Sequence, residues 1–241
     1  MPHFLIKKEE IKNNIIELID NENFFHLTKV LRVKAGQKVK FIDENKNVYH
    51  CEIKEVNKKT LIANILETTV SDRVLNNNIV LIQSILASDA QNLLIANATQ
   101  TGVKKIYPVM SDNVSVSMSA LKGKVEKWNK ISYENFKQCE RADMALVEEI
   151  SNLKDILSQF KKENILIFAE KYENTDLNNC ILDIDKTAPI ALVVGPEGGF
   201  SNEEFNYFID KNYKLITLGK MIYKAPNAAV VAISNIVSRI E

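Results

Sequence analysis

Runs of apolar residues separated by polar turns change their spacing near residue 75. Before this point the apolar runs are short, at 4–6, 38–42, 48–56 and 61–66, with a short helical pattern at 23–31. Short strands at this spacing indicate a small barrel or sandwich. The polar segment SDRVLNNN (71–78) reads as a linker. We therefore expect a β-barrel domain over residues 1–70.

After the linker, apolar strands alternate with helices. The pattern predicts strands at 79–86, 105–109, 145–149, 165–169, 190–194 and 214–218, with a short extended piece at 114–116. It predicts helices at 89–101, 119–141, 153–160 and 228–240, and a further helix start at 201. Strands alternating with helices indicate an α/β domain with a parallel sheet, here over residues 75–241. The last helix is apolar nearly all round, so we expect it in a core or a subunit interface.

Glycine is scarce in this chain and is concentrated near its end. Four of the seven glycines are Gly195, Gly198, Gly199 and Gly219. The GPEGG segment follows the apolar run 190–194 directly, and Ser201 with Glu204 has the pattern of a capping box at a helix start. Such strand-to-helix turns bind ligands in open α/β sheets. Gly219 follows the next strand, and we expect both glycine turns to face one ligand.

The GPEGG turn matches neither a Walker A loop nor a GxGxxG motif. Backbone amides at a helix start favour an anion, but Glu197 inside the turn would repel phosphates. Glu197 suits a hydroxyl, an amino group or a cationic ligand. It has an equally good structural interpretation, in which it holds the turn through hydrogen bonds. No histidine follows His50, so histidine acid–base chemistry is confined to the first domain.

Composition narrows the class of protein. A hydrophobic content of 46% and a charged content of 26% are typical of soluble globular proteins. The three cysteines are far apart, which indicates neither a disulfide framework nor a zinc site and fits a reducing cytosol. No apolar run is long enough to cross a bilayer, and the first residues lack a signal-peptide pattern. We expect a cytoplasmic protein with no metal site and no membrane partner.

Charge leaves room for a local basic surface. The formal net charge is zero, which argues against a generally basic nucleic-acid binder but not against one basic face. The segment FFHLTKVLRVKAG carries His26, Lys29, Arg32 and Lys34. These side chains form either a solvated amphipathic face or an edge that contacts phosphates.

Several motifs together resemble one family. GPEGGFSNEE followed by LGKMIYKAPNAAVVAI resembles the two C-terminal motifs of SPOUT methyltransferases, most of all the RsmE family of 16S ribosomal RNA uracil-N3 methyltransferases. HLTKVLRVKAG (26–36), NATQTGVKKIYPV (97–109) and QCERA (138–142) are similar to that family's HxxxVLRxxxG, KATELGVxxIxPL and QSxR. The resemblance therefore covers most of the chain.

The resemblance implies a fold and an activity. It implies a PUA-like RNA-binding β-barrel, followed by a SPOUT-type α/β domain with a C-terminal trefoil knot. It also implies a homodimer that uses S-adenosyl-L-methionine to methylate N3 of a specific uridine in 16S rRNA of the small ribosomal subunit. By matching positions, it implies a cofactor pocket lined by Val194, Gly195, Glu197, Gly198, Gly199, Leu218, Gly219, Ile222 and Tyr223.

The chain departs from the family pattern at its last motif. The family's LRTETA is YKAPNA here, so that Lys224 stands at the place of an arginine and Pro226 at that of a glutamate. Asn113 likewise replaces an arginine. Removal of the weakly acidic N3 proton is favoured by a nearby cation, and Lys224 and Arg141 are the candidates.

Two other functions stay open. The altered motif also fits a non-catalytic RNA-binding or ribosome-assembly protein that keeps the fold. The glycine turns also fit a small-molecule enzyme that binds a nucleotide. For an RNA-binding role, the candidate contacts are His26, Lys29, Arg32 and Lys34.

Overall fold

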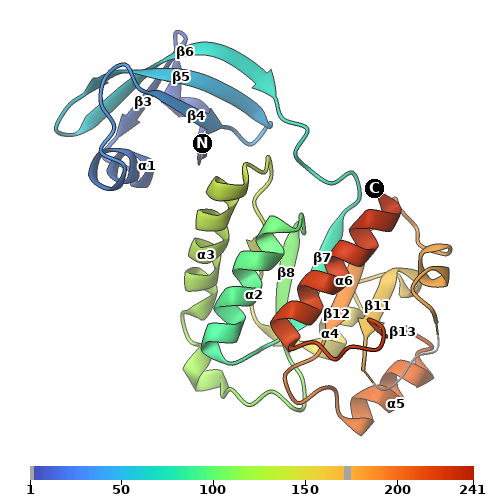
Figure 1. The fold of residues 1–241 in the computed structure, drawn as a ribbon. Helices are drawn as coiled ribbons and strands as arrows, with labels where there is room; N and C mark the ends of the chain where they lie inside the picture. The colour runs from blue at the N-terminus through green and yellow to red at the C-terminus, as the bar shows by residue number, and fades with distance from the viewer. Residues whose placement is uncertain (1–2, 171–174) are drawn as a thin grey trace. The chain divides into compact units, whose positions relative to one another are not determined.

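The computed structural model describes residues 3–170 and 175–241, which form two compact units (Figure 1). The N-terminal unit runs to Val74 and also includes Phe136–Asp143, whereas the C-terminal unit comprises Leu75–Asn135 and Met144–Glu241. No sequence pattern assigned residues 136–143 to the first unit. The domain boundary between residues 70 and 75 stays a prediction.

The N-terminal unit is built on a six-stranded sheet in the order β1-β4-β5-β6-β3-β2. Its strands are β1 (His3–Leu5), β2 (Ile11–Lys12), β3 (Ile15–Ile19), β4 (Lys38–Ile42), β5 (Asn47–Val56) and β6 (Thr60–Val70). β1 pairs with β4 in parallel and the other pairings are antiparallel. Alternation explains β4, because Val39 and Phe41 point into the core while Lys38 is exposed. The pattern did not predict β2 or β3.

A short helical segment crosses from β3 to β4. It consists of α1 (Glu22–Phe25) and one π-helical turn (His26–Val30), where the sequence predicts a single helix over 23–31. The side chain of Asn21 caps its start by accepting a hydrogen bond from the Phe24 backbone N–H at 2.8 Å. Arg32, with a φ of 53°, turns the chain out of the helix.

The C-terminal unit has a parallel sheet, as the alternation of elements predicts. Among the described residues its order is β10-β8-β7-β12-β11-β13, with β9 also beside β8. The strands are β7 (Ile79–Ser84), β8 (Lys105–Met110), β9 (Leu146–Val147), β10 (Ser151–Asn152), β11 (Ile165–Phe168), β12 (Ile190–Val194) and β13 (Lys214–Ile216). The segment 114–116 is not part of the sheet, and β13 ends two residues earlier than predicted.

Helices cover both faces of this sheet, which explains why its central strands are apolar throughout. They are α2 (Ser88–Gln100), α3 (Lys124–Cys139), α4 (Leu153–Leu157), α5 (Asn202–Asp210) and α6 (Ala225–Ile240). In β7, Ile79 and Leu81 pack in the core beneath α2, α3 and α6, whereas Val80 and Ile82 pack in the core beneath α4 and α5. Figure 1 shows this three-layer arrangement.

Two helices begin elsewhere than the pattern predicts. α3 begins at Lys124 rather than 119, because Gly123, with a φ of 71°, separates it from a 3-10 turn at Met118–Leu121. α6 begins at Ala225, three residues before the predicted 228, and Pro226 lies in its first turn, where proline is tolerated.

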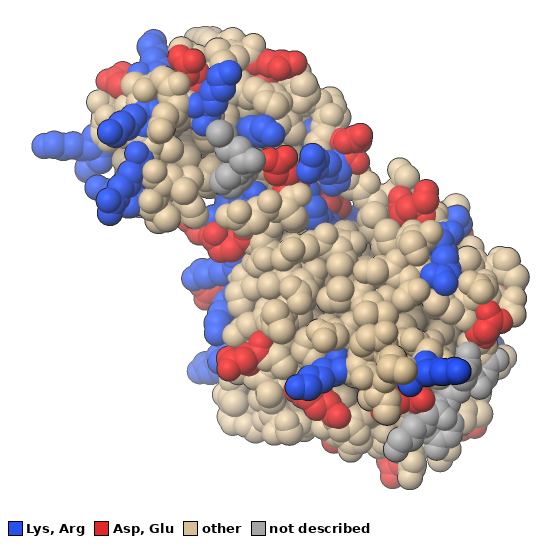
Figure 2. Space-filling view, in the orientation of Figure 1, with Lys and Arg blue, Asp and Glu red and all other residues tan. Residues whose placement is uncertain are grey.

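The face of the C-terminal unit that α2 and α6 form carries few charged side chains, and most of these lie at its margin (Figure 2). Leu93 on α2 is 51% exposed. The sheet order places β12, which comes late in the chain, between β7 and β11. This order is consistent with the trefoil knot, which stays a prediction.

Candidate ligand site at the glycine turns

The GPEGG turn joins β12 to α5 at the carboxyl edge of the parallel sheet. The capping box is present: the Ser201 side chain accepts from the Glu204 N–H, and the Glu204 carboxylate accepts from the Ser201 N–H at 2.8 Å. A second backbone donor, the Asp112 N–H, lies 3.1 Å from the Glu204 carboxylate. Glu204 is buried, and desolvation raises its pKa although these hydrogen bonds oppose the shift.

Glycine is favoured inside the turn for two physical reasons. Gly199 has a φ of 71°, a conformation that L-residues with a side chain adopt at a cost, and its N–H closes the turn onto the Pro196 carbonyl at 2.9 Å. A Cβ on Gly198 would lie 3.3 Å from the Asn113 Cβ, and one on Gly195 would lie 3.2 Å from the Phe200 ring.

Two side chains from other parts of the chain, and one from the turn itself, hold the turn in place. Gln83, fully buried at the end of β7, donates to the Gly195 carbonyl at 3.0 Å. Asn113 donates to the Gly199 carbonyl at 3.0 Å. Glu197 accepts from the Ala87 N–H at 3.0 Å, at the start of α2. The structural interpretation of Glu197 is therefore supported by a specific contact, without excluding a ligand.

Sequence reasoning assigned no role to Gln83 and treated Asn113 only as a lost cation. A signal for Gln83 existed, because a glutamine inside the apolar run 79–86 must hydrogen-bond when it is buried. Asn113 gave no such signal, since its contact depends on a segment 85 residues further along the chain.

The turn presents backbone donors, whereas its Gly195, Pro196 and Gly199 carbonyls already accept hydrogen bonds. Among the described hydrogen bonds, the N–H groups of Glu197 and Gly198 have no acceptor, and Pro196 has no N–H. Unpaired amides in a tight turn at a sheet edge are suited to a neutral acceptor or an anion on a ligand. The turn can therefore bind an acceptor edge, such as that of an aromatic heterocycle.

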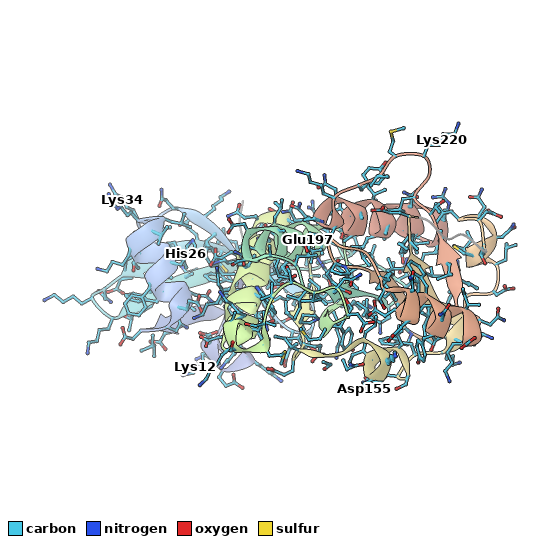
Figure 3. All side chains as sticks on the ribbon, turned by 90° about the horizontal axis from the view of Figure 1, so that it is seen from below. Lys12, His26, Lys34, Asp155, Glu197 and Lys220 are labelled. Atoms are coloured by element: carbon cyan, nitrogen blue, oxygen red, sulfur yellow. The ribbon has the colours of Figure 1, made fainter. Side chains whose placement is uncertain are left out.

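The second glycine turn follows β13 and leads into α6. Because β12 and β13 both pair in parallel with β11, the two turns leave the same edge of the sheet. Leu218 and Tyr223 are half-buried, and Ile222 is 77% exposed. Figure 3 shows Lys220 extending away from this loop. No described pocket encloses both turns. A pocket of about 380 Å³ lies instead at the opposite edge, beside Lys162 and Lys214.

The two candidate catalytic residues lie in different units. Lys224 is exposed at the N-terminus of α6 and belongs to the C-terminal unit. Arg141 belongs to the N-terminal unit, is 5% exposed, and pairs with Asp143 at 2.8 Å. Their catalytic roles stay predictions, and the environment of Arg141 gives it a structural task.

The four candidate RNA contacts lie together on the helical segment that includes α1 and on the loop after it. Lys29, Arg32 and Lys34 are exposed, whereas His26 is half-buried, with its Nδ1 3.2 Å from the Lys137 ammonium. Their role in RNA binding stays a prediction.

Comparison with known proteins identifies the class. A model of the RNA methyltransferase domain matches residues 73–237, and a model of the RNA methyltransferase PUA domain matches residues 19–66. The first match covers more than half of the chain. The chain therefore belongs to the RNA methyltransferase family, with a PUA domain in its N-terminal unit, as the motifs predict.

Within this family, similar proteins share one name. Ribosomal RNA small subunit methyltransferase E of Rickettsia conorii is 28% identical over 93% of this chain and 90% of its own length. The protein of the same name from Aquifex aeolicus is 27% identical, covering 94% of this chain and 95% of its own. The crystal structure of that methyltransferase from Neisseria gonorrhoeae, bound to S-adenosyl methionine, is 25% identical with a TM-score of 0.85, over 99% of this chain and 97% of its own.

Proposed function

We propose that this RNA methyltransferase transfers a methyl group from S-adenosyl-L-methionine to N3 of a specific uridine in 16S rRNA of the small ribosomal subunit. The observation that carries the proposal is the GPEGG turn, whose Glu197 and Gly198 amides are free to donate while Gln83 and Asn113 hold its carbonyls. The names of the similar proteins support small-subunit ribosomal RNA as the substrate class. The resemblance of the sequence motifs to the RsmE family supports uridine N3 as the methylated atom.

The residues present fit this cofactor. The free amides suit the acceptor nitrogens of an adenine ring, and a Cβ at Gly195 or Gly198 would crowd the turn. Val194, Gly195, Glu197, Gly198 and Gly199 would hold one side of the cofactor. The other side would be lined by Leu218, Gly219, Ile222 and Tyr223. When bound, the cofactor would supply an electrophilic methyl group on a cationic sulfonium, and a carboxylate in the turn, Glu197, would favour that charge.

For this reaction the N3 atom of the target uridine must be accessible, and its proton must be removed. N3 is paired inside a helix, so the target uridine must be single-stranded or splayed out. A cation beside O2 or O4 stabilises the charge that develops when the N3 proton leaves. Lys224 is the candidate, because the described residues give its ammonium no carboxylate partner and Arg141 is already paired with Asp143. Alignment of N3 with the methyl group accounts for the remaining rate enhancement of methyl transfer.

We also propose that the protein acts as a homodimer. The weakly charged face over α2 and α6 supports this proposal (Figure 2). Leu93 on α2 is exposed, and Val230 and Val231 on α6 are half-exposed. Exposed apolar side chains on a face with few charges favour an interaction site.

The decisive experiment is methyl incorporation from labelled S-adenosylmethionine into small ribosomal subunits from a strain that lacks this gene. Nucleoside analysis of the product should show 3-methyluridine. Cofactor binding without incorporation into any ribosomal substrate would instead indicate the non-catalytic assembly role. Binding of NAD or ATP in place of S-adenosylmethionine would indicate the small-molecule enzyme.

A further inference from the structure

An exposed aromatic ring lies on the helical segment of the N-terminal unit. Phe25, the last residue of α1, is 47% exposed. Its neighbour Phe24 is buried in the core, and the two rings meet edge to face with centroids 5.5 Å apart. Val30 and Leu31 are exposed on the same segment. A ring held from below and open to solvent above offers a flat surface to a ligand.

The same part of the chain is rich in cations. α1 begins with one carboxylate, Glu22, but residues 23–42 contain five cations and no carboxylate, although the net charge of the whole chain is zero. Lys29, Arg32 and Lys34 are exposed, and none has an ion-pair partner among the described residues. Figure 2 shows lysine and arginine atoms edging this part of the unit, and Figure 3 shows Lys34 extending into solvent. Exposed cations and an exposed aromatic ring on one segment favour a polyanion that carries flat groups.

His26, the residue after Phe25, is fixed by a buried lysine. The Lys137 ammonium is 3.2 Å from His26 Nδ1 and 5.7 Å from the centroid of the Phe4 ring, which also packs against the imidazole. An ammonium can only donate, so Nδ1 accepts and the ring proton lies on Nε2. Nε2 has no described hydrogen-bond partner. Lys137 is therefore a positioning residue: it fixes the His26 ring so that the Nε2–H is available to donate a hydrogen bond to a ligand.

We propose that Phe25, His26, Lys29, Arg32 and Lys34 form a stacking platform for a single-stranded segment of the RNA substrate. Phe25 stacks on one unpaired base, the three cations contact the flanking phosphates, and His26 donates from Nε2 to a phosphate or base oxygen. RNA fits better than a protein partner, because a protein surface would have to supply several carboxylates around one pocket for Phe25. This proposal rests on the proposed RNA substrate.

The test is the affinity of the full chain for a short single-stranded RNA, measured by fluorescence anisotropy. Loss of one base–aromatic stack weakens binding by about 5- to 150-fold, so Phe25→Ala should lie in this range. Phe25→Trp should bind at least as well as the wild type. Phe25→Leu, which keeps the apolar surface without the π face, should resemble Phe25→Ala. Ile19→Ala, an exposed apolar residue on β3, is the matched control and should change nothing.

Salt dependence tests the cations separately. Lys29→Ala should reduce the slope of log affinity against log salt by about 0.7, the value for one phosphate of a single strand. Equal binding by the Phe25→Ala and wild-type chains, or wild-type affinity in Phe25→Leu, would overturn the proposal. The proposal would also be overturned if Phe25→Ala lost affinity for assembled subunits but kept its affinity for naked RNA, because the surface would then bind a ribosomal protein.

The outcome can be separated from that of the proposed function. S-adenosylmethionine binding by the same variants should be unchanged, because the platform lies on the N-terminal unit and the glycine turns on the other. A wild-type chain that binds the cofactor but no single-stranded RNA overturns the platform and leaves the cofactor site standing. A chain whose RNA binding depends on Phe25 but that methylates nothing retains the platform and loses the proposed activity.

Discussion

Substitution of Gly199 by alanine isolates the backbone strain of the GPEGG turn. The new Cβ would meet no atom within 4 Å, so no steric clash arises. The φ of 71° lies in the left-handed region, which costs a residue with a Cβ about 1–2 kcal/mol. Either the folded state carries this strain, or the turn relaxes and moves the free amides of Glu197 and Gly198.

The two responses are distinguished by two measurements on the same variant. Calorimetric titration gives the affinity for S-adenosylmethionine, and denaturant unfolding gives the free energy of unfolding. We expect the two losses to sum to about 1–2 kcal/mol, that is, an affinity loss of up to about 30-fold if the turn relaxes completely.

Gly199→Asn is the matched control, because asparagine tolerates the left-handed region and should recover much of the loss. Gly198→Val adds bulk where a Cβ already lies 3.3 Å from Asn113, and should abolish cofactor binding. Wild-type affinity and stability in Gly199→Ala would refute the assignment of strain to this turn.

Three further predictions concern other parts of the chain. Lys224→Ala should lower turnover while cofactor affinity survives, and Lys220→Ala, an exposed cation on the preceding loop, should not. Leu93→Glu should shift the protein from dimer to monomer in sedimentation velocity, whereas Gln100→Glu on the same helix should not. Burial lowers the pKa of His3 to about 4, so between about pH 6.5 and 4 the unfolded chain binds the extra proton and stability falls with acidification. His3→Phe should remove that loss of stability on acidification, as measured by denaturant titrations at a series of pH values; an unchanged pH slope would contradict the buried neutral imidazole.

Local signals predicted the site turn well. The capping box at Ser201 and Glu204 and the strand at 190–194 could be read from the sequence, because each depends on residues three or four apart or on one apolar run. The α/β class followed from the alternation of elements in the same way.

Signals that depend on distant partners were not readable. The clamp from Gln83 to the Gly195 carbonyl joins residues 112 apart, and the contact from Lys137 to His26 joins residues 111 apart. The burial of Arg141 also went unseen, because QCERA reads as the exposed end of a helix until its partner Asp143 and its packing are known. The local sequence pattern therefore locates a loop along the chain, but it does not identify the distant side chains that hydrogen-bond to it.

The division of α3 between the two units limits how this gene can be rearranged. The helix is continuous from Lys124 to Cys139, yet Phe136 and the residues after it belong to the N-terminal unit, where the Phe136 ring lies 4.6 Å from that of His3. An exchange of the first 74 codons between distant relatives would replace one side of this contact and leave the other behind. We therefore expect an exchange of the PUA module to succeed only when residues 136–143, which complete its contacts, are exchanged with it.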